Sequence, residues 1–121
     1  MILDKIARLT DAKILCGETR LTRIDSPRAY ACDLMSDVLA LCSPGALLIT
    51  GLTNIQIVRT AQMLDIPAVL FVRGKTPMQD TISLADESEI TLIVSGMSMF
   101  QVCGILYAEG IKPCLLADAG A

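Results

Sequence analysis

The feature that most constrains the fold of this chain is a pattern that occurs three times between residues 46 and 101. Each time, an apolar run is followed by Gly-x-[Ser/Thr]-x-x-Gln, with the glycines at 51, 74 and 96. Continuous apolar runs are typical of parallel strands that are buried on both faces. A Ser or Thr with a Gln three residues later is typical of the capped start of a helix. The predicted helix caps are Thr53, Thr76 and Ser98.

The repeats predict three consecutive strand-helix units in the C-terminal two-thirds of the chain. The apolar runs at 46–50, 68–73 and 91–95 have the length of strands, and the segments after them carry apolar residues at helical spacing. Pro77 suits the first position of the second helix. Because consecutive units of this kind join parallel strands through right-handed crossovers, we expect an α/β fold with a mostly parallel sheet flanked by helices.

The remainder of the chain completes one predicted domain over residues 1–121. The expected elements are a helix at 3–10, a strand at 12–16, a loop at 18–28, a strand at 29–32 and a helix at 34–41. Asp33 is in position to cap the last of these helices. The small, apolar stretch 112–121 is expected to be a mobile tail.

Composition excludes several classes of function. With 53% apolar residues the chain is far from the disordered class, and its net charge of −3 and 3% aromatic content argue against nucleic-acid binding. No apolar run is long enough to cross a membrane, and the first residues lack the pattern of a signal peptide, so we expect none. The chain contains no histidine, which excludes Ser-His-Asp and Cys-His catalysis and His-ligated zinc.

Five cysteines give an odd count, and no pair has the spacing Cys-x-x-Cys. We therefore predict free thiols, no bound metal or other cofactor, and a reducing cytoplasmic location. A redox or metal-binding accessory protein is the alternative, and it requires Cys16, Cys32 and Cys103 to lie close together. The cysteines are Cys16, Cys32, Cys42, Cys103 and Cys114.

Several segments resemble the DRTGG-domain family, and in particular its stand-alone members. The most specific one is Tyr-x-x-Asp-Leu-Met-Ser-Asp at 30–37; the others are 14–17, 48–54 and 71–75. The Asp-Arg-Thr-Gly-Gly signature that names the family is absent, so the resemblance rests on these segments and on the order of the strand-helix units. The resemblance implies the fold of the N-terminal domain of HPr kinase/phosphorylase, and a regulatory or dimerising module without chemistry of its own. It implies no kinase activity, because the chain has no P-loop motif.

The three glycine turns form the first candidate site. Turns that follow parallel strands meet at one edge of the sheet, where ligands of open α/β sheets bind and where helix N-termini favour anions. Arg73 and Lys75 add positive charge to this edge, although the same turns would also serve simply as helix caps. The candidate ligand-binding residues are Thr50, Gly51, Thr53, Asn54, Arg73, Gly74, Lys75, Thr76, Ser95 and Ser98.

A second polar cluster lies in the otherwise apolar stretch 29–58. It could form half of a polar site that faces the glycine turns, and its two carboxylates could hold Mg²⁺. Helix capping by Asp33 and a favourable position of Asp37 at the helix dipole explain the same residues without a ligand. The cluster consists of Tyr30, Asp33, Ser36 and Asp37.

Together these observations predict a non-enzymatic regulatory module. It would sense a small anionic metabolite, such as a nucleotide or another phosphorylated compound, or dock onto a larger enzyme. A homodimer is expected, because the domain is too small to bury all its apolar surface. The alternative from another class is an enzyme that acts on a phosphorylated small molecule at the edge formed by Thr50, Arg73 and Ser95.

Overall fold

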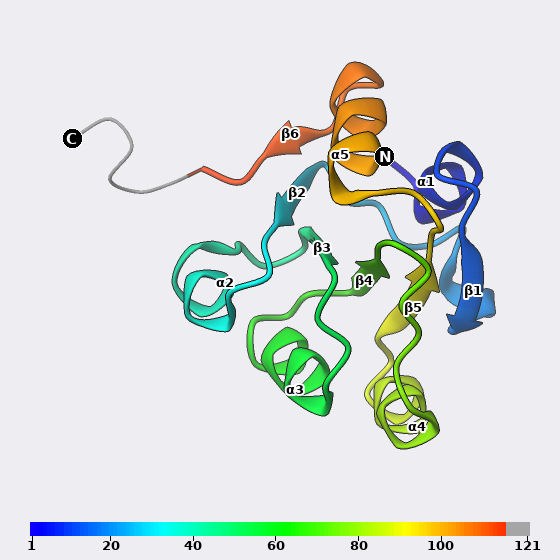
Figure 1. Ribbon diagram of the computed structural model, residues 1–121, viewed down its shortest axis with the longest axis vertical. Coiled ribbons are helices and arrows are strands. Elements are labelled where there is room, and N and C mark those ends of the chain that lie inside the picture. Colours follow the sequence, from blue (N-terminus) through cyan, green and yellow to red (C-terminus); the bar gives the residue numbers. More distant parts are fainter. Residues whose placement is uncertain (116–121) are drawn as a thin grey trace.

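The computed structural model describes residues 1–115 and contains five α-helices and six strands (Figure 1). Strands β3, β4 and β5 coincide with the three apolar runs, and every residue in them is buried. In chain order the elements are α1 (Leu3–Leu9), β1 (Lys13–Cys16), the 3-10 helix η1 (Glu18–Arg20), β2 (Arg28–Ala31), α2 (Met35–Leu41), β3 (Leu47–Thr50), α3 (Ile55–Met63), β4 (Ala68–Phe71), α4 (Gln79–Glu87), β5 (Thr91–Val94), α5 (Met99–Ala108) and β6 (Lys112–Pro113).

The six strands form one sheet in the order β1-β5-β4-β3-β2-β6. Four adjacent pairs are parallel, which confirms the predicted α/β fold with a mostly parallel sheet. Only β1 runs antiparallel, beside β5. The direction of β1 was not predicted, because the sequence of a short apolar strand does not show whether it pairs parallel or antiparallel with its neighbour.

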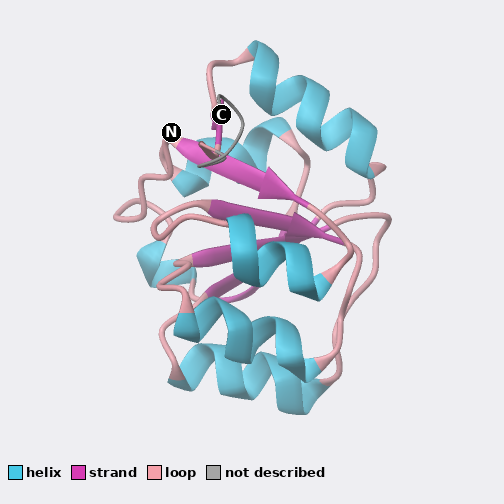
Figure 2. Ribbon diagram, turned by 90° about the vertical axis from the view of Figure 1, so that its left-hand side faces the viewer, coloured by secondary structure: helices cyan, strands magenta, loops and turns pink. Residues whose placement is uncertain are grey.

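The helices cover both faces of the sheet, in a three-layer arrangement (Figures 1 and 2). The strands β2 to β5 are in sequence order, so right-handed crossovers place α2, α3 and α4 on one face. After β5 the chain returns through α5 to the far side of β2, and α5 therefore lies with α1 on the opposite face.

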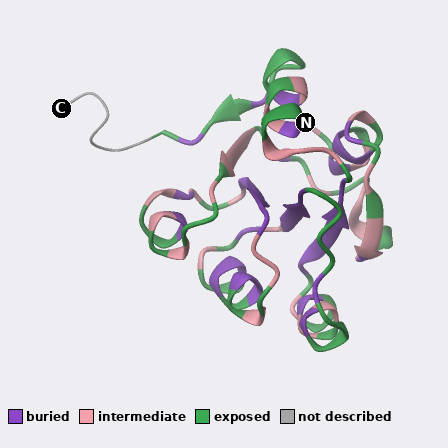
Figure 3. Cartoon of the chain, in the orientation of Figure 1, coloured by how far each residue is buried: buried purple, intermediate pink, exposed green. Residues whose placement is uncertain are grey.

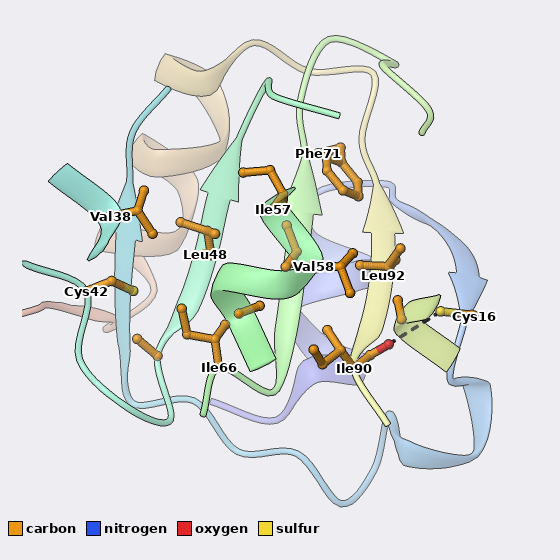
Figure 4. Close-up of a cluster of buried hydrophobic side chains, with 14 of the residues drawn as sticks. Cys16, Val38, Cys42, Leu48, Ile57, Val58, Ile66, Phe71, Ile90 and Leu92 are labelled. Atoms are coloured by element: carbon orange, nitrogen blue, oxygen red, sulfur yellow. Dashed lines mark hydrogen bonds between the residues drawn. The ribbon is translucent and has the colours of Figure 1, made fainter. Parts of the chain in front are cut away.

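Alternating side chains of each strand fill two cores, one on each face of the sheet. Leu48 and Phe71 pack under α2, α3 and α4 (Figure 4), whereas Ile49 and Leu70 pack under α1 and α5. All four side chains are at most 1% exposed. Burial of a side chain of this size contributes about 1.5–3 kcal/mol to stability. The purple centre of Figure 3 is this double core.

Only one of the three predicted helix caps is correct. Ser98 caps α5 with a complete capping box that includes Gln101. The predictions for Thr53 and Thr76 are wrong, because α3 and α4 begin after Asn54 and Met78, and neither of these residues caps with its side chain. In α3, the burial of Ile57 and Val58 outweighs the local cap motif. In α4, Pro77 is itself buried ahead of the helix and does not lie in its first turn.

Two further segments differ from the sequence-based expectation. Asp33 does not cap α2, whose N-cap is Leu34 and has no side-chain hydrogen bond. The stretch expected to be a mobile tail begins with β6, which pairs with β2 in parallel and is followed by the buried Cys114. The rest of the predicted tail, residues 116–121, lies outside the described residues.

Candidate ligand-binding site

The carboxyl ends of β2, β3, β4 and β5 meet at one edge of the sheet, because these four strands are parallel neighbours. The turn after β3 begins with Gly51, the turn after β4 contains Arg73 and Gly74, and the turn after β5 contains Gly96. Asp33 follows β2 at the same edge. The topology therefore brings Asp33 and the three glycine turns together.

Asp33 is hydrogen bonded to the turn after β3. Its Oδ1 accepts a hydrogen bond from the Gly51 backbone N–H at 2.6 Å and another from the Thr50 hydroxyl at 3.0 Å. A carboxylate that accepts from a backbone N–H forms one of the stronger hydrogen bonds in proteins. This use of the carboxylate explains why Asp33 is not available to cap α2.

Arg73 extends its side chain over the same glycine. A methyl group placed on the Gly51 Cα would lie 2.6 Å from Arg73 Nη2 and 3.3 Å from Asp33 Oδ2. A side chain at position 51 would therefore displace the guanidinium, which is the end of a flexible side chain. Within residues 1–115, ion pairs at 4.0 Å or less join Met1 to Asp25, Arg8 to Asp4 and Arg20 to Asp86, and Arg73 takes part in none of them.

The backbone at Arg73 has the left-handed conformation, with φ of 59°, and Gly74 follows with φ of 66°. Lys75 N–H donates to the Val72 carbonyl at 3.2 Å, so residues 72–75 form a tight turn with positive φ at both central positions. The N–H groups of Arg73 and Gly74 donate to the carbonyls of Met97 and Ser95, both at 2.8 Å. These bonds hold the turns after β4 and β5 together.

The helix that follows β4 (α4) and the helix that follows β5 (α5) lie on opposite faces of the sheet. The chain therefore leaves the ends of these two neighbouring strands in opposite directions. Such a topological switch point is where ligands of open α/β sheets bind. Here the two backbone hydrogen bonds from Arg73 and Gly74 bridge the strand ends. The backbone N–H groups of Arg73, Gly74 and Lys75 are therefore used internally, and the exposed side chains of Arg73 and Lys75 are the groups of this turn that could contact a ligand.

Two predicted site residues serve the internal structure of the turns. Thr50 and Ser95 are fully buried. Each hydroxyl accepts a hydrogen bond from the backbone N–H two residues later and donates one across the fold, from Thr50 to Asp33 and from Ser95 to the Thr10 carbonyl at 2.6 Å. Both hydroxyls are thus fully used in holding the turns.

The other predicted residues of the edge differ in accessibility. Asn54, Lys75 and Thr76 are exposed, and Thr53 is half-buried at the start of α3. The hydroxyl of Ser98 is engaged in the capping box of α5. Lys75 thus provides an accessible positive charge two residues after Arg73.

The second predicted cluster divides into two parts. Asp33 faces the glycine turns, whereas Tyr30 and Asp37 lie around the thiol of Cys32, whose Sγ is 4.0 Å from Asp37 Oδ2. Burial raises the pKa of Tyr30, and the neighbouring Cys32 and Asp37 raise it further. Ser36 is exposed in the first turn of α2. The sequence did not single out Cys32 as the centre of this group, and only its position between Tyr30 and Asp37 could have suggested it.

All five cysteines are free thiols, and burial raises the pKa of Cys16 and Cys103 above the usual range. Burial and the adjacent Cys114 raise the pKa of Cys42 to about 12. Cys16 ends β1 and Cys32 follows β2, and these strands are four strand spacings of about 4.8 Å apart; Cys103 lies on α5. Cys16 and Cys32 therefore do not lie close together, as the redox or metal-binding alternative requires. In the part of the chain that the structure describes, no three His, Cys, Asp or Glu residues converge as metal ligands, and no helix could span a membrane.

Comparison with known proteins bears on the fold. No protein-family model matches the chain, and no curated protein sequence matches it. Among solved structures, the chain is similar to the CBS and DRTGG domains of the regulatory region of Clostridium perfringens pyrophosphatase, solved with its activator diadenosine tetraphosphate. The TM-score is 0.72 at 19% identity, over 98% of this chain and 52% of that one. The chain has a DRTGG-like fold.

This likeness confirms the resemblance inferred from the sequence, at the level of the fold. The chain spans about half the length of the pyrophosphatase region that it matches. At 19% identity, the likeness to this regulatory region shows the fold alone.

Proposed function

We propose that this DRTGG-like chain is a non-enzymatic, ligand-sensing regulatory module that binds a small anionic metabolite through Arg73. The observation that carries the proposal is the position of the guanidinium, which lies over Gly51 near Asp33 and forms no ion pair among the described residues. A guanidinium binds phosphate through two parallel hydrogen bonds. Lys75 supplies a second positive charge to the same turn.

The backbone of Arg73 supports a role for its side chain. Left-handed φ costs an L-residue about 1–2 kcal/mol, and glycine would adopt it freely. The other non-glycine residues with positive φ in residues 1–115 are Asp11, Asp65 and Glu89, and each lies two residues after the last residue of a helix. Arg73 instead follows a strand, at the edge where ligands of this class of fold bind.

Asp33 narrows the class of ligand. Its Oδ1 is engaged by Gly51 and Thr50, whereas Oδ2 faces the same space as Arg73. A bare anion would be repelled by this carboxylate. A ligand that carries both a phosphate for Arg73 and a hydroxyl or amino donor for Asp33 would be favoured, as in a nucleotide or a sugar phosphate.

The proposal extends to assembly and location. We propose that the module is a homodimer and that it acts by docking onto a larger enzyme, as its fold is used in the regulatory region of a pyrophosphatase. Its five free thiols suit a reducing compartment such as the cytoplasm.

A thermal-shift series tests the ligand site. The protein is heated with millimolar phosphate, AMP, ATP, ribose 5-phosphate or diadenosine tetraphosphate, since a ligand of the native state must raise the melting temperature. Calorimetry then compares Arg73→Ala with the wild type for the compound that gives the largest shift. Loss of a hydrogen bond to a charged group, about 1.5–3 kcal/mol, corresponds to a Kd raised about 10- to 150-fold.

Two variants sharpen this test. Gly51→Ala displaces the guanidinium, and we expect weaker binding with little loss of stability, because the group displaced is the end of a flexible side chain. Arg23→Ala is the matched control, because Arg23 is also exposed but lies in the loop that enters β2, at the opposite edge of the sheet. The proposed site is wrong if none of these compounds raises the melting temperature, or if Arg23→Ala weakens binding as much as Arg73→Ala.

A further inference from the structure

Helix α5 exposes apolar surface that the single chain leaves uncovered. It contains no charged residue, and Val102 and Leu106 bury one side of it against the sheet. On its flank, Phe100 is 88% exposed and Tyr107 is 72% exposed. A helix that is apolar all round is normally covered on every side. Figure 3 shows this helix at the top of the molecule, with exposed residues along its outer side.

The exposed flank has a regular composition, and we refer to Phe100, Cys103, Gly104 and Tyr107 as the α5 stripe. These positions are three, four and seven residues apart, so they share one face of the helix. Two large aromatic residues enclose two small ones, and the sizes are symmetric about the midpoint between Cys103 and Gly104. An antiparallel copy of the helix, related by a two-fold axis at that midpoint, would place Phe100 against Tyr107 and the small residues at the crossing.

Gly104 has no evident role in the single chain. A Cβ built on it meets nothing within 4 Å, so the fold of one chain has room for a larger residue. Glycine destabilises the middle of a helix, because it loses more backbone freedom than other residues. Small residues at a crossing instead allow two helix backbones to approach closely. The single chain therefore gives no steric reason for glycine at position 104, whereas a crossing with a second helix would give one.

A pocket beside the stripe provides a place for an aromatic side chain. It has a volume of about 280 Å³, lies between α5 and the strands β2 and β6, and is lined mainly by apolar groups, including Cys103, Tyr107 and Pro113. An apolar cavity of about 150 Å³ is enough to hold benzene. In the antiparallel arrangement, Phe100 of the second copy lies next to Tyr107 at the mouth of this pocket. An aromatic anchor in an apolar pocket is the usual centre of a protein interface.

We propose that a second copy of this chain docks on the α5 stripe, with the two α5 helices antiparallel across a two-fold axis. This inference rests on the proposed homodimer and assigns its interface. Two buried aromatic side chains from each copy contribute about 300–500 Å² of buried area per partner. A standard interface buries about 800 Å² per partner, so the pocket rim and the small residues must supply the rest. Because the stripe carries no charge, no ion has to be desolvated.

Light scattering after gel filtration, with the protein near 100 μM, tests the assignment. The wild type should have twice the 12.9 kDa mass of the chain. Gly104→Arg should be monomeric without a lower melting temperature, because the side chain has room in the single chain and arginine favours helix. Met63→Lys is the matched control, since Met63 is 71% exposed on α3, and this variant should remain a dimer.

A charge-pair experiment tests the antiparallel orientation. Phe100→Lys and Tyr107→Glu should each weaken the dimer at least tenfold, because each removes an aromatic anchor and buries an unpaired charge at the interface. The double variant should dimerise more tightly than either single variant, because opposite charges then face each other on both sides of the axis. These two positions are seven residues apart on one helix and do not contact each other within one chain.

The outcomes separate the two proposals. A wild type of 12.9 kDa overturns both the homodimer and its interface. A dimer that survives both Gly104→Arg and Phe100→Lys overturns the α5 interface alone, as does a dimer that is lost in Met63→Lys. A double variant no tighter than the single variants overturns the antiparallel orientation. The ligand site is tested separately, because Arg73 lies outside the stripe.

Discussion

Replacement of Asp33 by alanine should destabilise the protein although Asp33 is an exposed residue. The change removes the acceptor for the Gly51 N–H, at 2.6 Å, and for the Thr50 hydroxyl, at 3.0 Å. Gly51 and Thr50 are both buried, so their donors lose a partner in a place that water reaches poorly. Exposed surface residues usually change stability by less than about 0.5 kcal/mol when they are replaced.

The structure sets the size of this effect. A hydrogen bond to a charged group contributes about 1.5–3 kcal/mol, and some of this is recovered because water can enter where the exposed carboxylate was. We therefore expect a loss of about 2 kcal/mol in the free energy of unfolding. For a domain of this size the loss corresponds to a melting temperature about 8 °C lower. Asp33→Asn keeps an oxygen acceptor, and its loss should be about 1 kcal/mol or less.

Urea unfolding followed by far-ultraviolet circular dichroism measures the effect, since the chain has no tryptophan. Ser36→Ala is the control, because Ser36 is exposed on the neighbouring turn of α2 and no hydrogen bond is recorded for its side chain among residues 1–115. A value for Asp33→Ala within 0.5 kcal/mol of the wild type would refute the reasoning. It would mean that solvent replaces both hydrogen bonds and that Asp33 does not hold the turn after β3.

Two further predictions follow from the caps and from the thiols. Ser98→Ala should lower the free energy of unfolding by about 1 kcal/mol, as is usual for a lost N-cap, and Thr53→Ala and Thr76→Ala by less than about 0.5 kcal/mol; equal losses in urea titrations would contradict the observed cap pattern. Because the pKa of Cys42 is raised in the folded state from 9.0 to about 12, the stabilising contribution of the protonated thiol is complete below pH 9 and is lost as the pH rises towards 12. Between pH 8 and pH 10, the free energy of unfolding should therefore fall by about 1 kcal/mol more for the wild type than for Cys42→Ala. Equal falls in the two proteins would contradict the raised pKa of Cys42.

Much of the secondary structure could be predicted from the sequence, because its causes are local. The runs that became β3, β4 and β5 are continuous and apolar, and only strands buried on both faces need such runs. The turn residues at Gly51, Gly74 and Gly96 marked the strand ends. Their repetition indicated parallel strands, and therefore a shared edge at which polar residues would collect.

The local motifs were less reliable where packing competed with them. The same Gly-x-[Ser/Thr]-x-x-Gln pattern led to a capping box at Ser98 but not at Thr53 or Thr76. A cap is worth about 1 kcal/mol, which is less than the burial of one large apolar side chain at the start of a helix. At α3 and α4 the burial of Ile57 and of Pro77 outweighs the cap, and each helix begins later than the local motif predicts.

The sequence by itself determined that this chain forms strand-helix units around a parallel sheet, and that its polar turns share one edge. Only the tertiary structure decided that β1 runs antiparallel, that β6 returns beside β2, and that Asp33 and Arg73 both lie next to Gly51. The physical reason is the range of the interactions. Alternation, turns and caps act over a few residues and can be read directly. Strand order and side-chain partners depend on segments 17 to 85 residues apart, such as Asp33 with Thr50 and Ser95 with Thr10, whose pairing is set by the packing of the whole domain.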